Sequence, residues 1–186
     1  MRHITFVTSN DIKYNQGERM AEVLGFAMDR AVVDFVEIQA DGETIARNKA
    51  QQAFDALRKP VVVLDDTWDI PGLNGFPGAY MKDVNGWFRS EDWLRLTDTL
   101  TDRRIRLMQH GVYQDEYMQH YIVATIEGQL LHEIRGESPN TPHLAITTFD
   151  GSRSGAEILA EGGVIIDETM RNVWNELADW FATQEN

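Results

Sequence analysis

Two adjacent carboxylates, Asp65 and Asp66, follow the apolar run Val61–Leu64 and precede a loop rich in glycine and proline that reaches Lys82. A short valine-rich run bounded by turn residues is typical of a strand buried on both faces. Acids at the carboxyl end of such a strand lie where open α/β sheets place their ligand crevice. We therefore interpret the pair as part of a site. The alternative is that both acids are solvated loop residues or helix caps.

A second candidate site follows the first predicted strand, Arg2–Thr8. Ser9 and Asn10 are favoured helix N-cap residues, and the helix that they begin is expected to end at the glycine after Leu24. The N–H groups and positive dipole of a helix N-terminus attract anions, and Lys13 in the first turn adds a full charge. The alternative is an ordinary capped helix with a solvated lysine.

Further elements must position these residues. We predict a second strand, Ala31–Val36, that carries Glu37 at its end, and a helix from the N-cap Asp41 to about Arg58. The apolar stripe of that helix is Ala46, Ala50, Ala53 and Leu57. With Val61–Leu64 as the third strand, the first eighty residues alternate strand and helix, as in α/β proteins.

The second half of the chain has a different pattern. A short helix is expected over Ser90–Leu100, and three strand-like runs follow it: Ile105–Tyr113, Tyr117–Ile126 and Leu130–Gly136. Glu127–Gln129 is a credible hairpin turn between the last two. These runs predict an antiparallel second lobe.

The C-terminal part is less regular. We expect a short strand or helix over Leu144–Phe149, a turn over Asp150–Gly155, and a final strand over Val164–Ile166. Asp167 is expected to cap a last helix that runs to about Ala182. The apolar face of this helix is Val173, Trp174, Leu177, Trp180 and Phe181.

Composition limits the partners. The chain has 186 residues, 42% of them hydrophobic, and no cysteine, which excludes disulfides and zinc–thiolate sites. Its formal net charge is −13, with 30 acids against 17 bases, and a protein that follows a nucleic-acid backbone needs a basic surface instead. We therefore expect no long nucleic acid and no membrane as partner. The absence of cysteine is compatible with a reducing cytoplasm, which is the expected location. A small anion can bind if a metal or a few lysines neutralise it locally.

Three motifs, in order and with matching spacing, resemble the inosine-triphosphate pyrophosphatase (Ham1-like) family of nucleotide diphosphatases. Thr8–Lys13 is similar to its T-[GS]-N-x-x-K opening, and Asp34–Gln39 is similar to its D-L-x-E-x-Q segment. Leu64–Thr67 followed by Gly75–Tyr80 is similar to its [DE]-D-[ST] strand end and G-x-P-G-x-Y loop. The resemblance covers about the first half of the chain.

The resemblance implies a Mg2+-dependent hydrolysis of non-standard purine nucleoside triphosphates, such as dITP, ITP and XTP, to the monophosphate and pyrophosphate. It implies Mg2+, with Mn2+ as an alternative, and a homodimer. Carboxylates are the hard ligands that Mg2+ prefers, so the predicted metal ligands are Glu37, Asp65 and Asp66. Asp66 and Lys13 are the predicted catalytic residues, Asp66 as the base that takes the proton of water. The predicted substrate-binding residues are Thr8, Ser9, Asn10, Lys13, Thr67, Lys82, Phe149, Asp150 and Arg171.

The second half departs from the family. The base-holding F-G-[WY]-D-P-x-F segment is reduced to Phe149-Asp150, only Arg171 remains of the S-H-R segment, and Trp68 replaces a small residue. Two alternatives therefore stay open: a diphosphatase for a different modified or standard dNTP, and a nucleotide-binding relative without turnover.

The predicted fold is α/β: a mixed, mostly three-layer, elongated sheet with flanking helices and an antiparallel second lobe, like the inosine-triphosphate pyrophosphatases. We expect a single domain over residues 1–186. Its α/β lobe would take residues 1–85 and 160–186, and its antiparallel lobe residues 86–159.

Overall fold

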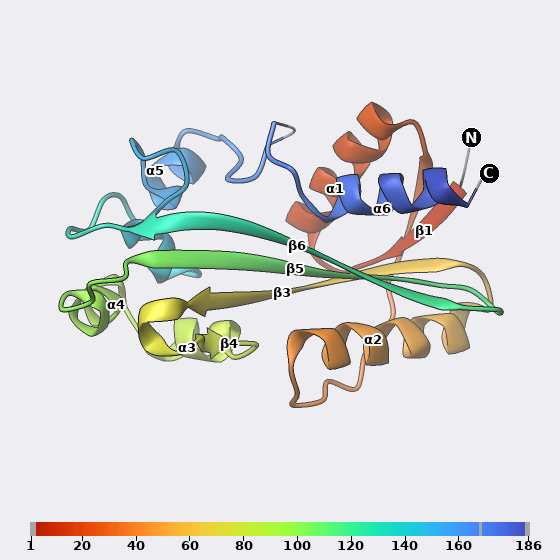
Figure 1. Cartoon of the computed structure of the whole chain (residues 1–186), viewed down its shortest axis with the longest axis horizontal. Helices are drawn as coiled ribbons and strands as arrows, with labels where there is room; N and C mark the ends of the chain where they lie inside the picture. Colours follow the sequence, from red (N-terminus) through yellow and green to blue (C-terminus); the bar gives the residue numbers. More distant parts are fainter. Residues whose placement is uncertain (1–2, 168, 185–186) are drawn as a thin grey trace. The chain divides into compact units, whose positions relative to one another are not determined.

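The structure is a computed structural model that describes residues 3–167 and 169–184 (Figure 1). The chain forms two compact units. The first unit comprises Met1–Asp66, Gln109–Ala124 and Glu168–Asn186, and the second comprises Thr67–Met108 and Thr125–Asp167. Three strands contribute residues to both units: β3 (Val61–Ile70), β5 (Arg104–Gln114) and β6 (Gln119–Leu130).

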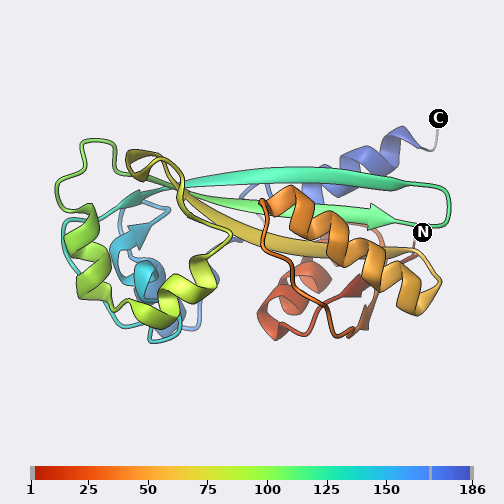
Figure 2. The ribbon, with the colours of Figure 1, turned by 90° about the horizontal axis from the view of Figure 1, so that it is seen from below.

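The first unit is a three-layer α/β arrangement. Its strands follow the order β2-β1-β3-β5-β6, in which β1 (His3–Val7) pairs parallel with both β2 (Ala27–Ala31) and β3. Helices α1 (Asp11–Leu24) and α6 (Val173–Thr183) pack on one face, around a core that contains Val62. Helix α2 (Gly42–Leu57) covers the other face (Figures 1 and 2). Val61 and Val63 pack in the core on that face. This alternation along one strand confirms that Val61–Val63 is buried on both faces.

The helix ends of the first unit follow from local capping. The Asn10 side chain accepts hydrogen bonds from the backbone N–H groups of Ile12 and Lys13 and so begins α1. Gly25 ends the same helix with a φ of 79°, a left-handed conformation that favours glycine. Asp41 caps α2 by accepting from the N–H of Thr44. The predicted bounds of these two helices are confirmed.

The second unit is built around short elements. β4 (Phe76–Gly78) pairs antiparallel with the distal part of β3, and β7 (Thr147–Thr148) pairs antiparallel with the distal part of β6. The helices of this unit are the 3-10 helices η1 (Pro71–Leu73) and η2 (Pro142–Ile146) with α3 (Met81–Trp87), α4 (Ser90–Thr97) and α5 (Gly155–Ala160). Its core surrounds the fully buried Trp93. The two units together confirm the predicted mixed α/β fold.

The predicted strand Ala31–Val36 is wrong. β2 ends at Ala31, where it pairs with Val7 at the end of β1, and residues 32–40 contain no strand. Instead, the Gln52 side chain of α2 bonds to both the N–H and the C=O of Val36. A side-chain amide thus satisfies the backbone that a strand would have paired, and Glu37 lies in an irregular segment.

The third and sixth strands are longer than predicted. β3 continues to Ile70 because Trp68 and Ile70 pair with β4, so Asp65 and Asp66 lie inside the strand and not at its end. β6 continues through the predicted turn Glu127–Gln129 to Leu130, and Leu130–Gly136 forms no further strand. A Cβ on Gly128 would lie 2.7 Å from the Thr148 carbonyl oxygen, so this glycine allows a close approach to β7 and does not make a turn.

The C-terminal boundaries also differ from the prediction. Val164–Ile166 is not a strand, and the last helix begins at Val173, where the Asn172 side chain accepts from the N–H of Trp174. Asp167 is therefore not its N-cap. Helices α3 and α5 were not predicted because they have only 7 and 6 residues, too few to show a helical apolar period.

Trp174 is the principal side chain of the first unit's core. Its indole is fully buried and its ring centroid lies 5.0 Å from that of Phe6, in an edge-on contact. We expect Trp174→Ala to lower the free energy of unfolding by about 3–5 kcal/mol, since it removes a large buried ring and leaves a cavity. Urea unfolding followed by circular dichroism measures this loss. Trp87→Ala is the matched control: this side chain is 75% exposed, and its loss should change stability by less than about 1 kcal/mol.

Candidate functional site

An ion pair joins the start of α1 to the acidic segment of β3. Lys13 Nζ lies 3.0 Å from Asp66 Oδ2, and the two side chains are 23% and 26% exposed. The second oxygen of Asp66, Oδ1, is buried and has no hydrogen-bond partner among the described residues. A buried carboxylate oxygen without a donor is costly, so this atom is suited to a cation or a water molecule.

The turn between β1 and α1 is held by its own side chains. The Asn10 N–H donates to Thr8 Oγ1 over 3.1 Å, while the Asn10 side chain caps the helix. Thr8 is buried and Ser9 is exposed. The structure thus brings Thr8, Ser9, Asn10 and Lys13 together on one turn, with Lys13 directed at Asp66.

A lysine that the sequence analysis missed joins the other two acids. Lys49 Nζ lies 2.9 Å from Asp65 Oδ1 and 3.5 Å from Glu37 Oε1, and the Lys49 side chain is only 14% exposed. A signal for it was present in the sequence. Lys49 lies three residues after Ala46 and four before Ala53, which places it on the buried side of α2.

The three carboxylates predicted as metal ligands are engaged in ion pairs. Glu37, Asp65 and Asp66 all belong to the first unit, and each is paired with a lysine. Residues 3–167 and 169–184 contain no group of three or more histidines and acids that could hold a metal ion by themselves. The donor chemistry nevertheless fits Mg2+, which takes one or two carboxylates and completes its shell with water and phosphate oxygens. Asp66 Oδ1 is the oxygen that is free for this purpose.

The remaining predicted residues are dispersed over other elements. Thr67 is buried in β3, Lys82 is exposed in the first turn of α3, and Phe149 is half-buried after β7. The Phe149 ring centroid lies 6.2 Å from that of Trp68, which also contacts His143 edge-on at 4.5 Å. These aromatic rings belong to the second unit.

Asp150 organises the turn that follows Phe149. Its Oδ1 accepts from the N–H groups of Ser152 and Arg153 over 2.8 and 2.9 Å. These donors hold the pKa of Asp150 well below its usual range. The carboxylate is thus already used in folding the loop.

Arg171 is paired with two carboxylates. Its guanidinium lies 2.7 Å from Glu176 and 2.5 Å from Asp179, both on α6, and its side chain is 59% exposed. These hydrogen bonds raise the pKa of Arg171 further above its ordinary value. A phosphate or base that bound Arg171 would have to compete with both acids.

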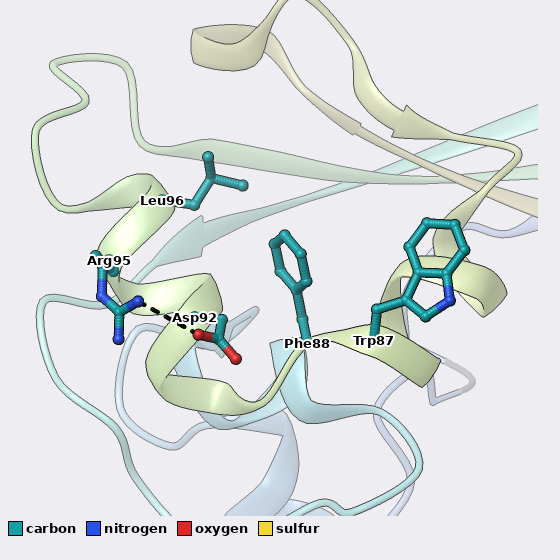
Figure 3. Close-up of a pocket in the computed structure, with 5 residues that line it drawn as sticks. All are labelled: Trp87, Phe88, Asp92, Arg95 and Leu96. Carbon is teal, nitrogen blue, oxygen red and sulfur yellow. Dashed lines mark hydrogen bonds and ion pairs between the residues drawn. The ribbon is translucent and has the colours of Figure 1, made fainter.

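An open groove of about 420 Å³ lies in the second unit (Figure 3). It is lined by Trp87, Phe88, Asp92, Arg95 and Leu96. The Asp92 carboxylate is engaged with Arg95 and with the N–H of Arg89. None of the predicted site residues lines this groove.

Comparisons with known proteins agree with the motifs. The sequence model of the Ham1 family matches residues 4–140. A dITP/XTP pyrophosphatase of Methanopyrus kandleri is 29% identical over 136 residues, which cover 72% of each chain. An inosine triphosphate pyrophosphatase of Tuber melanosporum is 33% identical over 86 residues, 46% of this chain and 45% of that one. The solved structure of a HAM1 protein from Coxiella burnetii superposes with a TM-score of 0.75 at 17% identity, covering 98% of this chain and all of that one.

His143 gives the second unit a pH-dependent stability. Burial lowers its pKa from 6.5 to about 3, so between these values the unfolded chain binds a proton that the folded chain does not. Stability is therefore complete above about pH 6.5 and falls as the pH drops, by up to about 1.4 kcal/mol per pH unit. We expect His143→Gln to reduce this slope, because glutamine keeps an amide near Asn85 but does not titrate. Urea unfolding from about pH 7 to pH 4 measures it. The exposed His132→Gln is the control and should leave the slope unchanged.

Proposed function

This chain belongs to the Ham1 family and is a nucleoside-triphosphate pyrophosphatase, and we propose that it hydrolyses non-standard purine nucleoside triphosphates such as dITP, ITP and XTP with Mg2+. The products would be the nucleoside monophosphate and pyrophosphate. The observation that supports this most is the 3.0 Å contact between Lys13 and Asp66, which links a helix N-terminus to an acidic strand. The names of the relatives, dITP/XTP pyrophosphatase and inosine triphosphate pyrophosphatase, support the substrate class.

The first unit would bind the triphosphate. A triphosphate brings about four negative charges, which an acidic protein binds only with local cations. The Ser9 hydroxyl and the N–H groups at the N-terminus of α1 would donate hydrogen bonds to its oxygens, with Lys13 supplying a full positive charge. As the phosphate approaches, Lys13 would move its interaction from Asp66 to the phosphate and so free the carboxylate. Asp66 could then take the proton of the attacking water.

The carboxylates of the first unit would hold the metal. A bound Mg2+ lowers the pKa of coordinated water and screens the phosphate charge. Asp66 Oδ1 would supply an oxygen for it, while metal binding by Glu37 and Asp65, which face Lys49 of α2, stays a prediction. Lys49 would keep Glu37 and Asp65 close to each other despite their like charges, since it contacts both.

A second candidate function differs in the nucleobase of the substrate. The family match ends at residue 140, before Phe149, Asp150 and Arg171. Trp68 lies against the Phe149 ring, and Asp150 is occupied by its own turn. These contacts favour the alternative in which the enzyme acts on a different modified or standard dNTP. Substrate binding by Phe149, Asp150, Arg171 and Thr67, and contact of Lys82 with the phosphates, stay predictions, as does homodimer formation.

Asp66→Asn tests the assigned base and metal ligand. We expect the turnover of the preferred substrate to fall by about 10²–10⁴-fold, because the amide can neither accept the proton nor hold the cation as a carboxylate does. A pyrophosphate-release assay over standard, deaminated and modified NTPs and dNTPs measures it and identifies the base preference.

Asp69→Asn is the control for that experiment, since this acid lies on the same strand but pairs with Arg106. It should retain nearly full turnover. Equal pyrophosphate release by wild type and Asp66→Asn on every nucleotide would show that Asp66 is not the general base.

Metal removal tests the cofactor. We expect a chelator to abolish pyrophosphate release and Mg2+ or Mn2+ to restore it. Mg2+ should also raise the melting temperature of the wild-type protein in the absence of nucleotide, by mass action on the folded state, and raise it less in Asp66→Asn. Full activity after exhaustive chelation would contradict a metal-dependent mechanism.

A further inference from the structure

We propose that Arg30 is a positioning residue of the phosphate-binding turn, which holds the turn's backbone and neutralises the carboxylate of Asp11. The inference rests on the proposed function, because it assigns the Thr8–Lys13 turn to the phosphates. No motif of the sequence analysis includes Arg30, which lies on β2, twenty-two residues after Thr8.

The guanidinium of Arg30 reaches the turn from the neighbouring strand. In the parallel register of β1 and β2, Arg30 lies opposite Phe6, and Ala31 lies opposite Val7. The Arg30 Nε–H donates to the Thr8 carbonyl oxygen over 3.1 Å. The Thr8 N–H donates to the Ala31 carbonyl over 3.0 Å. β2 therefore holds both the backbone N–H and the backbone C=O of Thr8, at the residue where β1 ends and the turn begins.

The same guanidinium contacts the first residue of α1. Arg30 Nη1 lies 2.7 Å from Asp11 Oδ1, and its Cζ lies 5.0 Å from the centre of the Tyr14 ring. The Tyr14 ring and the two acceptors fix the plane of the guanidinium, whose side chain is 29% exposed. Arg30 thus contacts both ends of the connection between β1 and α1: Thr8, where β1 ends, and Asp11, where α1 begins.

Asp11 makes this neutralisation necessary. Its side chain is 81% exposed, and it lies between Asn10 and Lys13 in the chain, at the helix end that would accept the phosphates. A free carboxylate there suits the helix dipole but repels a triphosphate. The Arg30–Asp11 pair is close to neutral as a whole, so the attraction of Lys13 and the helix N-terminus for an anion is not cancelled.

A double-mutant cycle separates this role from a general contribution to folding. We expect Arg30→Met to raise KM about tenfold for every nucleoside triphosphate, whatever its base, with kcat within about twofold of wild type, as for the loss of a charge-assisted contact. Asp11→Asn in the Arg30→Met background should recover a substantial part of the KM, because it removes the uncompensated charge. Arg30→Lys keeps the charge but loses the two-pronged geometry of the guanidinium, so its KM should lie between those of the wild type and Arg30→Met.

A second readout does not depend on turnover. Inorganic tripolyphosphate, which has no base, should raise the melting temperature of the wild type and of Arg58→Met. The latter is a matched control whose arginine pairs with Asp55, on the C-terminal turn of α2. The same addition should raise the melting temperature of Arg30→Met much less.

The outcomes distinguish the two proposals. If the wild type releases no pyrophosphate from any nucleotide but tripolyphosphate stabilises it through Arg30, the proposed function fails and the role of Arg30 stands. If the wild type is active and Arg30→Met has an unchanged KM, or if Asp11→Asn recovers none of the loss, the role assigned to Arg30 is overturned. An equal response of Arg30→Met and Arg58→Met to tripolyphosphate would overturn it as well.

Discussion

A strongly acidic protein can bind a polyanion only if it concentrates its few cations at the binding site. In this chain, Lys13 contacts Asp66 over 3.0 Å and Lys49 contacts Asp65 over 2.9 Å, and all four side chains are at most about a quarter exposed. Pairs that are shielded to this degree are less weakened by solvent than surface pairs. Each lysine holds a carboxylate in place, and each carboxylate holds its lysine in place. The site therefore has its charges in position before any ligand or metal arrives.

The alternation of side chains along β3 explains why Asp65 and Asp66 contact different lysines. Residues along β3 alternate between the face covered by α2 and the face covered by α1 and α6, as Val61–Val63 show. Asp65 and Asp66 continue this alternation, and so they meet lysines from different helices, Lys49 of α2 and Lys13 of α1. Two successive acids on one strand thus pair with two different lysines, one on each face of the sheet, and do not compete for the same cation. The period of the strand alone accounts for the pairing.

The sequence predicted the parts of the fold that local chemistry determines. Asn10, Asp41 and Gly25 act within four residues of themselves, and the helix ends that they imply are confirmed. Strand limits depend on partners that are distant in the chain, and these were wrong: β2 ends where β1 does, and β3 is extended by its pairing with β4. Lys49 was missed for a related reason, since a lysine on an alanine-rich helix face becomes informative only when an acidic strand covers that face. Glu37 was predicted at a strand end, yet it follows a segment held by Gln52.

The residues proposed for the phosphates and those predicted for the nucleobase depend on different kinds of structural constraint. The residues proposed for the phosphates lie within short segments, Thr8–Lys13 and Asp65–Asp66, whose geometry comes from capping and strand period, and the family match includes them. The residues predicted for the base lie beyond the match, in a part where Asp150 has become the centre of its own turn and Phe149 packs beside Trp68. A change in that aromatic packing would alter the space predicted for the nucleobase without disturbing a capped helix or a parallel strand. Base selectivity can therefore change in such a chain while the hydrolysis of the phosphate chain is retained, because different interactions support the two.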